Sequence, residues 1–76
     1  MRLVQTLELL WDARQYVAEG EKSVRQQRMH VERVKRRGED PTEEIMFLKL
    51  LEEMQEQYVA HMDSLNYQVI FIIRPD

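Results

Sequence analysis

The chain has 76 residues, of which 43% are apolar and 33% charged, with no Cys and a formal net charge of −3. This length allows one small domain with a thin core and leaves little room for a catalytic cleft. The lack of Cys excludes a disulfide scaffold and a zinc site built on thiolates. We therefore expect a protein that is not an enzyme and needs no cofactor.

The N-terminal stretch is apolar but is interrupted by Gln5, Glu8 and Asp12. It resembles neither the core of a signal peptide nor a membrane-spanning segment. Together with the lack of Cys, which fits a reducing compartment, this predicts a cytoplasmic protein.

A seven-residue repeat predicts a first helix over residues 2–37. One series of the repeat is apolar and consists of Leu3, Leu10, Val17, Val24 and Val31. The companion series, three residues further on, is small or polar and consists of Thr6, Ala13, Gly20, Gln27 and Val34. Two such series form the buried stripe of a coiled-coil helix.

The segment after this helix carries the signals of a helix-turn-helix connection, with the turn at residues 38–40. Gly38 can adopt the left-handed conformation that ends a helix. Asp40 is suited to cap the next helix, with Pro41 at its first position and Glu43 completing a capping box. Basic residues before the turn and acidic residues after it both oppose the helix dipoles.

A second helix is predicted over residues 41–66. Its heptad series are Leu51, Tyr58 and Leu65 on one side and Phe47, Met54 and His61 on the other. The alternating spacing of four and three residues is typical of a coiled-coil stripe.

Folding the chain at Glu39 predicts an antiparallel hairpin in which opposed residue numbers sum to about 78. In this register Gly20 faces Tyr58 and makes room for its ring, although a simple kink at Gly20 is the alternative. The predicted packing residues are Val17, Gly20, Val24, Val31, Phe47, Leu51, Met54, Tyr58 and Leu65.

The last segment, residues 67–76, is an apolar tail with two possible structures. Its run of β-branched residues suits a strand, which would be an edge in need of a partner. The heptad register of the second helix also extends into the tail through Val69 and Ile72, and on this ground we favour a helix that frays near Ile73.

A second apolar set lies outside the predicted stripe and includes Leu9, Leu50 and Val59. Two helices cannot cover both stripes, so we expect two hairpins to form a four-helix bundle as a homodimer. The candidate interface residues are Leu7, Trp11, Tyr16, Leu48, Met62, Ile70 and Phe71. The apolar end of the hairpin is also a candidate site for another protein, while a membrane surface is not an expected partner.

The stretch from Ala18 to Leu65 begins with AEGE, continues with a Gln-rich basic segment and a G-x-D turn, and ends in a stretch with His and Asp before a Leu. It resembles a group of short alphaproteobacterial helical-hairpin proteins that have no assigned activity. The resemblance covers about two thirds of the chain and implies the hairpin fold without any catalytic residue. The apolar tail departs from that pattern.

Few residues are candidates for chemistry. His30 and His61 lie on different predicted helices and do not oppose each other, and no Glu-x-x-His pair is present for a di-iron site. We expect His61 to be a partly buried core residue and His30 to be a solvated surface residue. A phosphoacceptor role of His30, as in the dimerisation hairpins of histidine kinases, is a weaker alternative.

The basic segment from Lys22 to Arg37 raises nucleic-acid binding as an alternative function. Its candidate contacts are Arg25, Arg28, Arg33, Lys35, Arg36 and Arg37. We favour pairing of these cations with solvent and with the acidic second helix, through Glu43, Glu44, Glu52 and Glu53, because the whole chain is acidic. The predicted function is thus a small oligomerisation or protein-interaction module.

Overall fold

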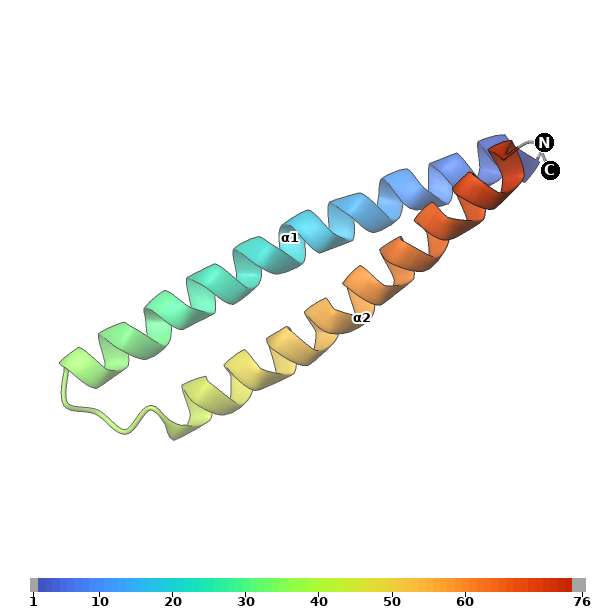
Figure 1. Cartoon of the computed structure of the whole chain (residues 1–76). Helices are drawn as coiled ribbons and strands as arrows, with labels where there is room; N and C mark the ends of the chain where they lie inside the picture. Colours follow the sequence, from blue (N-terminus) through green and yellow to red (C-terminus); the bar gives the residue numbers. More distant parts are fainter. Residues whose placement is uncertain (1, 75–76) are drawn as a thin grey trace.

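The computed structural model describes residues 2–74 and consists of two antiparallel helices, α1 (Arg2–Arg36) and α2 (Thr42–Ile73). They lie side by side along their whole length, with both chain ends at one end of the rod and the turn at the other (Figure 1). The Cα atoms span 60 × 15 × 14 Å. The predicted all-α hairpin is confirmed.

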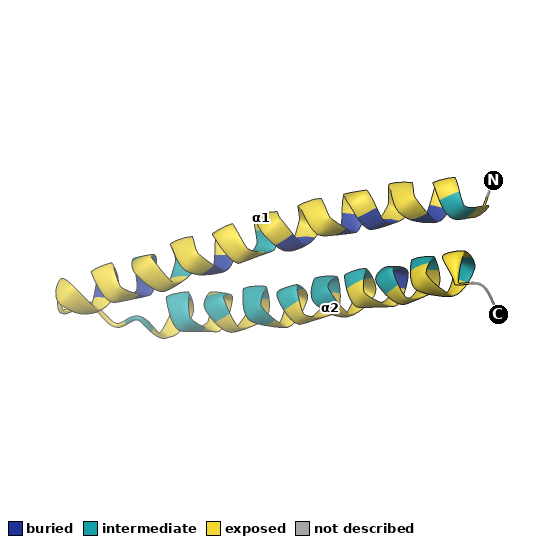
Figure 2. Cartoon of the chain, turned by 45° about the horizontal axis from the view of Figure 1, so that its top comes forward, coloured by how far each residue is buried: buried dark blue, intermediate teal, exposed yellow. Residues whose placement is uncertain are grey.

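The buried stripe of α1 matches the predicted repeat. Its buried residues are Thr6, Leu10, Ala13, Val17, Val24, Val31 and Val34. They follow the side of α1 that faces α2, and the outer sides of both helices are exposed (Figure 2). The buried Thr6 satisfies its hydroxyl by donating a hydrogen bond to the carbonyl of Arg2, at 2.8 Å.

The first helix ends in a Schellman motif at Gly38, which has a φ of 75°. The amide of Gly38 donates to the carbonyl of Lys35 at 3.0 Å, and the amide of Glu39 donates to the carbonyl of Val34 at 3.2 Å. Both bonds satisfy carbonyls that the last helical turn leaves free, and only a left-handed residue between them allows this geometry. The predicted role of Gly38 is confirmed, and the helix ends at Arg36, one residue earlier than predicted.

The second helix begins at Thr42, one residue later than predicted, with Pro41 at the N-cap position. The carboxylate of Asp40 accepts hydrogen bonds from the hydroxyl of Thr42 at 2.6 Å and from its backbone amide at 3.1 Å. The predicted capping box with Glu43 is wrong because Thr42 supplies both donors locally. These bonds, the hydroxyl one foremost, lower the pKa of Asp40.

The α2 helix continues to Ile73, which confirms the helical alternative for the tail as far as the structure describes it. Residues 75 and 76 of the predicted tail lie outside the described residues. The extension is anchored by a buried cluster of Leu10, Ala13 and Leu65, against which Met62 and Val69 pack. Tail residues therefore take part in the same hydrophobic contact that begins in the predicted second helix.

One of the two predicted series of α2, Leu51, Tyr58 and Leu65, lies on the inward side as predicted, whereas the other series does not. Phe47 and Met54 are 50% and 39% exposed, and His61 is exposed, so these three residues do not form the buried stripe. Their places are taken by the next residue in each case, namely Leu48, Gln55 and Met62. Of these, Leu48 and Met62 are residues predicted for the outer interface. The partly buried or buried residues of α2 are Glu44, Ile45, Leu48, Leu51, Glu52, Gln55, Tyr58, Val59, Met62, Leu65, Asn66, Val69 and Ile72.

Candidate interaction surfaces

Gln55 lies in the middle of the hairpin and reaches across it to α1. Its side-chain amide donates a hydrogen bond to the backbone carbonyl of Val17 at 2.9 Å. The amide group passes through the space next to Gly20, where a Cβ would lie only 2.8 Å from Cδ of Gln55. Gly20 therefore makes room for the Gln55 amide, and the prediction that it accommodates the ring of Tyr58 is wrong.

A second polar contact joins the helices nearer the turn. Nε2 of Gln27 donates to the backbone carbonyl of Glu44 at 3.0 Å. Among the described residues, Oε1 of Gln55 and Oε2 of Glu44 are buried without a hydrogen-bond partner. A buried unpaired polar atom costs on the order of 1 to 3 kcal/mol, so the polar layers weaken a core that is already thin.

One side of the hairpin, here called the Tyr16 face, combines aromatic and apolar side chains with polar ones. The aromatic and apolar residues are Tyr16, Phe47, Leu51, Met54 and Tyr58, and the polar ones include Glu19, Ser23, Gln26, His30, Arg33 and Glu43. The rings of Tyr16 and Tyr58 stack with centroids 5.8 Å apart and an interplanar angle of 23°. Next to them lies a hollow lined also by Met54, and further hollows with Phe47 in their walls follow towards the turn. Successive hollows share lining residues, so they form one shallow groove along this face.

The positions on this face explain why Phe47 and Met54 are exposed. Tyr16 and His30 lie two heptads apart on one edge of α1, and Phe47, Met54 and His61 lie one heptad apart on the adjoining edge of α2. Phe47, Met54 and His61, one of the two series predicted for the stripe of α2, thus form the border of the stripe. They belong to the surface that a single hairpin leaves uncovered.

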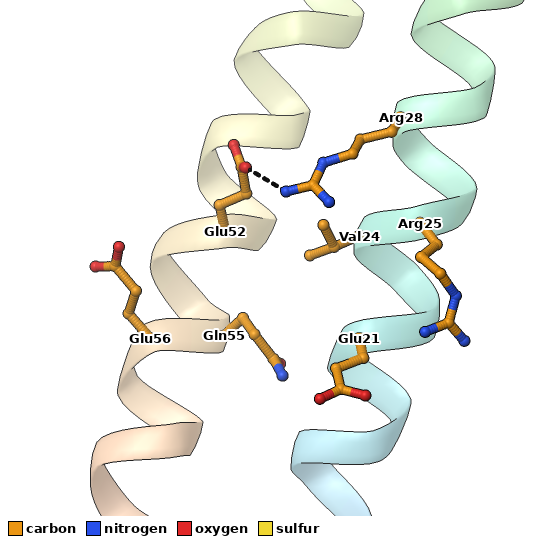
Figure 3. Close-up of a pocket in the computed structure, with 7 residues that line it drawn as sticks. All are labelled: Glu21, Val24, Arg25, Arg28, Glu52, Gln55 and Glu56. Atoms are coloured by element: carbon orange, nitrogen blue, oxygen red, sulfur yellow. Dashed lines mark hydrogen bonds and ion pairs between the residues drawn. The ribbon is translucent and has the colours of Figure 1, made fainter.

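The opposite side, here called the Arg28 face, is charged. It holds a hollow of about 380 Å³ lined by Val24 and Gln55 and otherwise by charged residues. Arg28 extends across the gap to Glu52, with 3.0 Å between guanidinium and carboxylate, whereas Arg25 and Glu56 point away from it (Figure 3). Both partners of the ion pair are substantially exposed, so the pair contributes at most about 1 kcal/mol.

The end of the rod that carries both chain ends is a third surface, here called the apolar end. Tyr67 and Phe71 lie together there, with ring centroids 6.0 Å apart. Trp11 and Phe71 are 65% and 68% exposed. The exposed large apolar residues of this end are Val4, Leu7, Leu9, Trp11, Tyr67, Ile70, Phe71 and Ile73.

The predicted interface residues are divided between the surface and the interior. Leu7, Trp11 and Tyr16 are exposed, as are Ile70 and Phe71 at the apolar end. Leu48 and Met62 are partly buried instead, and Met62 packs against the Leu10 cluster. Their assignment to an outer interface is wrong, because Leu48 and Met62 take the inward places predicted for Phe47 and His61.

The basic segment of α1 contributes little to holding the helices together. Within residues 2–74, one ion pair joins the helices, between Arg28 and Glu52, as predicted for that glutamate. The described residues show no such pair at Glu43, Glu44 or Glu53. Lys35 pairs with Glu32 on its own helix at 3.7 Å. Three of the six candidate nucleic-acid contacts are held in ion pairs: Arg28, Lys35 and Arg37.

The two histidines lie far apart on the Tyr16 face. His30 is partly buried and lines a hollow with Gln27, Glu43 and Phe47. His61 is exposed, so its predicted place in the core is wrong. The part of the chain that the structure describes contains no group of three or more His, Asp or Glu side chains placed to hold a metal ion.

Neither α1 nor α2, within the described residues, contains a stretch that is apolar and long enough to cross a membrane. No protein-family model, curated protein or solved structure matches this sequence significantly. The resemblance to the alphaproteobacterial hairpin proteins therefore stays a prediction from the sequence.

Proposed function

We propose that the chain is an oligomerisation or protein-interaction module that acts without catalysis, and that its first partner is a second copy of itself. The observation that carries this proposal is the small core. Seven apolar side chains are buried, and no described side chain is buried beyond 98%. Without a disulfide or a metal, a domain of this size commonly gains its stability from another chain.

The exposed area of the hairpin supports the same proposal. Its accessible surface is 6221 Å². A compact protein of 9.3 kDa exposes about 5,000 Å², so the hairpin exposes roughly 1,200 Å² more than a compact fold of its mass. A stable interface buries about 800 Å² on each partner, which the excess can supply.

The Tyr16 face is the side on which we place the second copy. It offers the groove beside Phe47 and Met54, and the hollow at Tyr16 and Tyr58 has one charged lining residue, Glu19. The hollow of the Arg28 face has five charged lining residues and no aromatic one. More charges would therefore have to lose water in a bundle core on that face, which is unfavourable without new partners. Two hairpins joined through their Tyr16 faces make a four-helix bundle.

Sedimentation equilibrium on two neighbouring variants tests this proposal. Phe47→Lys places a charge in the groove, and we expect it to give a monomer where the unchanged chain is a dimer. Met46→Lys is the matched control, because Met46 is 65% exposed and lies about 100° away around α2. A dimer that tolerates Phe47→Lys, or an unchanged chain that is a folded monomer, would contradict the proposal.

The acidic balance of the whole chain, a formal net charge of −3, does not favour nucleic acid as a second function of the basic segment. A gel shift with duplex DNA at low salt is the direct check, and we expect no binding. A phosphoacceptor role for His30 has no support from its surroundings in the hollow beside Phe47. The cytoplasm remains the compartment that the Cys-free sequence favours.

A further inference from the structure

The hairpin carries most of its charge at the turn end and most of its exposed apolar residues at the other end. Residues 20–37 contain seven Lys and Arg against two Glu, and residues 42–57 contain five Glu against one Lys. Both segments lie in the half of the rod that ends in the turn (Figure 1). The other half holds nine of the fourteen large apolar residues that are exposed in the described chain.

Two symmetric arrangements allow a second copy to cover the Tyr16 face. If the two-fold axis runs along the rods, both turns lie at the same end, and α1 of each copy packs on α2 of the other. If the axis runs across the rods, the turns lie at opposite ends, and each helix packs on its own counterpart. The arrangements differ in which half of one rod meets which half of the other.

We infer that the second copy lies with its turn at the same end as the turn of the first, so that α1 of each copy packs against α2 of the other. This inference rests on the proposed dimerisation through the Tyr16 face. It places the basic half of α1 over the acidic half of the second copy's α2, and opposite charges then face each other across the interface.

Individual residues of the face fit this arrangement. Arg33 lines the groove near the turn, and Glu43 lines the adjoining hollow from α2. With the turns together, Arg33 lies opposite Glu43 of the second copy, and the reverse pair forms by symmetry. At the other end, Leu9, one heptad before Tyr16, lies against the apolar half of the second copy.

The arrangement with opposite turns has neither the charge pair between Arg33 and Glu43 nor the apolar contact of Leu9. Arg33 and Glu43 would lie over the apolar end of the second copy, near Leu9, where they lose water without gaining an oppositely charged partner. The basic half of α1 would face residues 2–19 of the second copy, whose net charge is only −1. Charge pairing and apolar burial thus both favour the arrangement with the two turns at the same end.

Distance measurement between spin labels tests the orientation, and a chain without Cys accepts a single label at any chosen site. Glu39→Cys places the label in the turn, on an exposed residue whose interactions with the rest of the fold are a backbone hydrogen bond and a weak ion pair. With the turns together, the two labels lie about 20 to 30 Å apart, roughly the width of the bundle. With the turns opposite, they lie near the 60 Å length of the rod.

The matched control is Lys22→Cys, an exposed site near the middle of α1. Its label pair lies within about the width of the bundle under both arrangements, so it reports the dimer alone. A short distance at both sites supports the inference. A short distance for Lys22→Cys with a long one for Glu39→Cys overturns the orientation while leaving the dimer, whereas no pair distance at either site overturns the dimer and the orientation with it.

Discussion

Gln55 shows at the scale of single residues why the stripe of α2 is hard to predict. A pattern that searches for apolar repeats favours Met54 over Gln55, yet the structure places Gln55 between the helices because its amide bonds the carbonyl of Val17 and fits beside Gly20. The local sequence of α2 contains no sign of this. Gly20, which lies far away in the sequence on the other helix, makes a polar residue acceptable there.

A double-mutant cycle on Gly20 and Gln55 tests this coupling. In the unchanged chain, Gly20→Ala displaces the Gln55 amide, so the gain of about 0.5 to 1 kcal/mol in helix propensity is offset by the lost hydrogen bond. In a Gln55→Ala background the same substitution should stabilise the hairpin by about 0.5 to 1 kcal/mol. Urea unfolding measures both differences, and equal effects in the two backgrounds would rule out the contact.

Asp40 supplies a pH-dependent contribution at the start of α2. The hydrogen bonds from Thr42 lower its pKa, so the ionised form stabilises the fold. This stabilisation is complete above the ordinary Asp pKa of about 4 and is lost as the pH falls through the lowered value. The stability advantage over Asp40→Asn should therefore be present at neutral pH and disappear in acid. Urea unfolding of both proteins from neutral to acidic pH checks this, and a pH-independent difference would contradict it.

At the scale of elements, the sequence predicts α1, its ending and the turn well. The heptad repeat of α1 alternates apolar with small residues, so only one side of this helix can be the buried one. Gly38 ends the helix through its own left-handed conformation, which depends on no distant residue. In α2, apolar residues stand both in the stripe and beside it, as with Phe47 and Leu48, so two registers fit the pattern. Tertiary contacts with α1 decide between them, and the sequence of α2 does not contain this information.

The extension of α2 through the predicted tail makes Leu65 the main anchor of the apolar end. Leu65 is 4% exposed and packs in one cluster with Leu10 and Ala13. Leu65→Ala should lower the free energy of unfolding by about 2 to 5 kcal/mol. Met46→Ala, on the outer side of the same helix, should change it by no more than about 0.5 kcal/mol. Thermal or urea unfolding distinguishes these outcomes, and equal losses for both variants would contradict the packing described.

At the scale of the whole molecule, the hairpin has the features of half a bundle. Its core is one residue layer deep between two helices, while the Tyr16 face and the apolar end remain exposed. The second chain that we propose is a prediction from the number of apolar residues in the sequence. The sequence does not predict which of these residues are exposed, because Leu48 and Met62 lie inward in α2 and Phe47 and Met54 outward.

The dependence of unfolding on protein concentration tests most directly whether a second copy completes the fold. If the folded state is a dimer, mass action stabilises it as the concentration rises. We expect the urea midpoint, followed by circular dichroism, to increase clearly between about 1 and 100 µM chain. The same midpoint at both concentrations, with helical signal retained at the lower one, would show that the hairpin folds alone and would contradict the account.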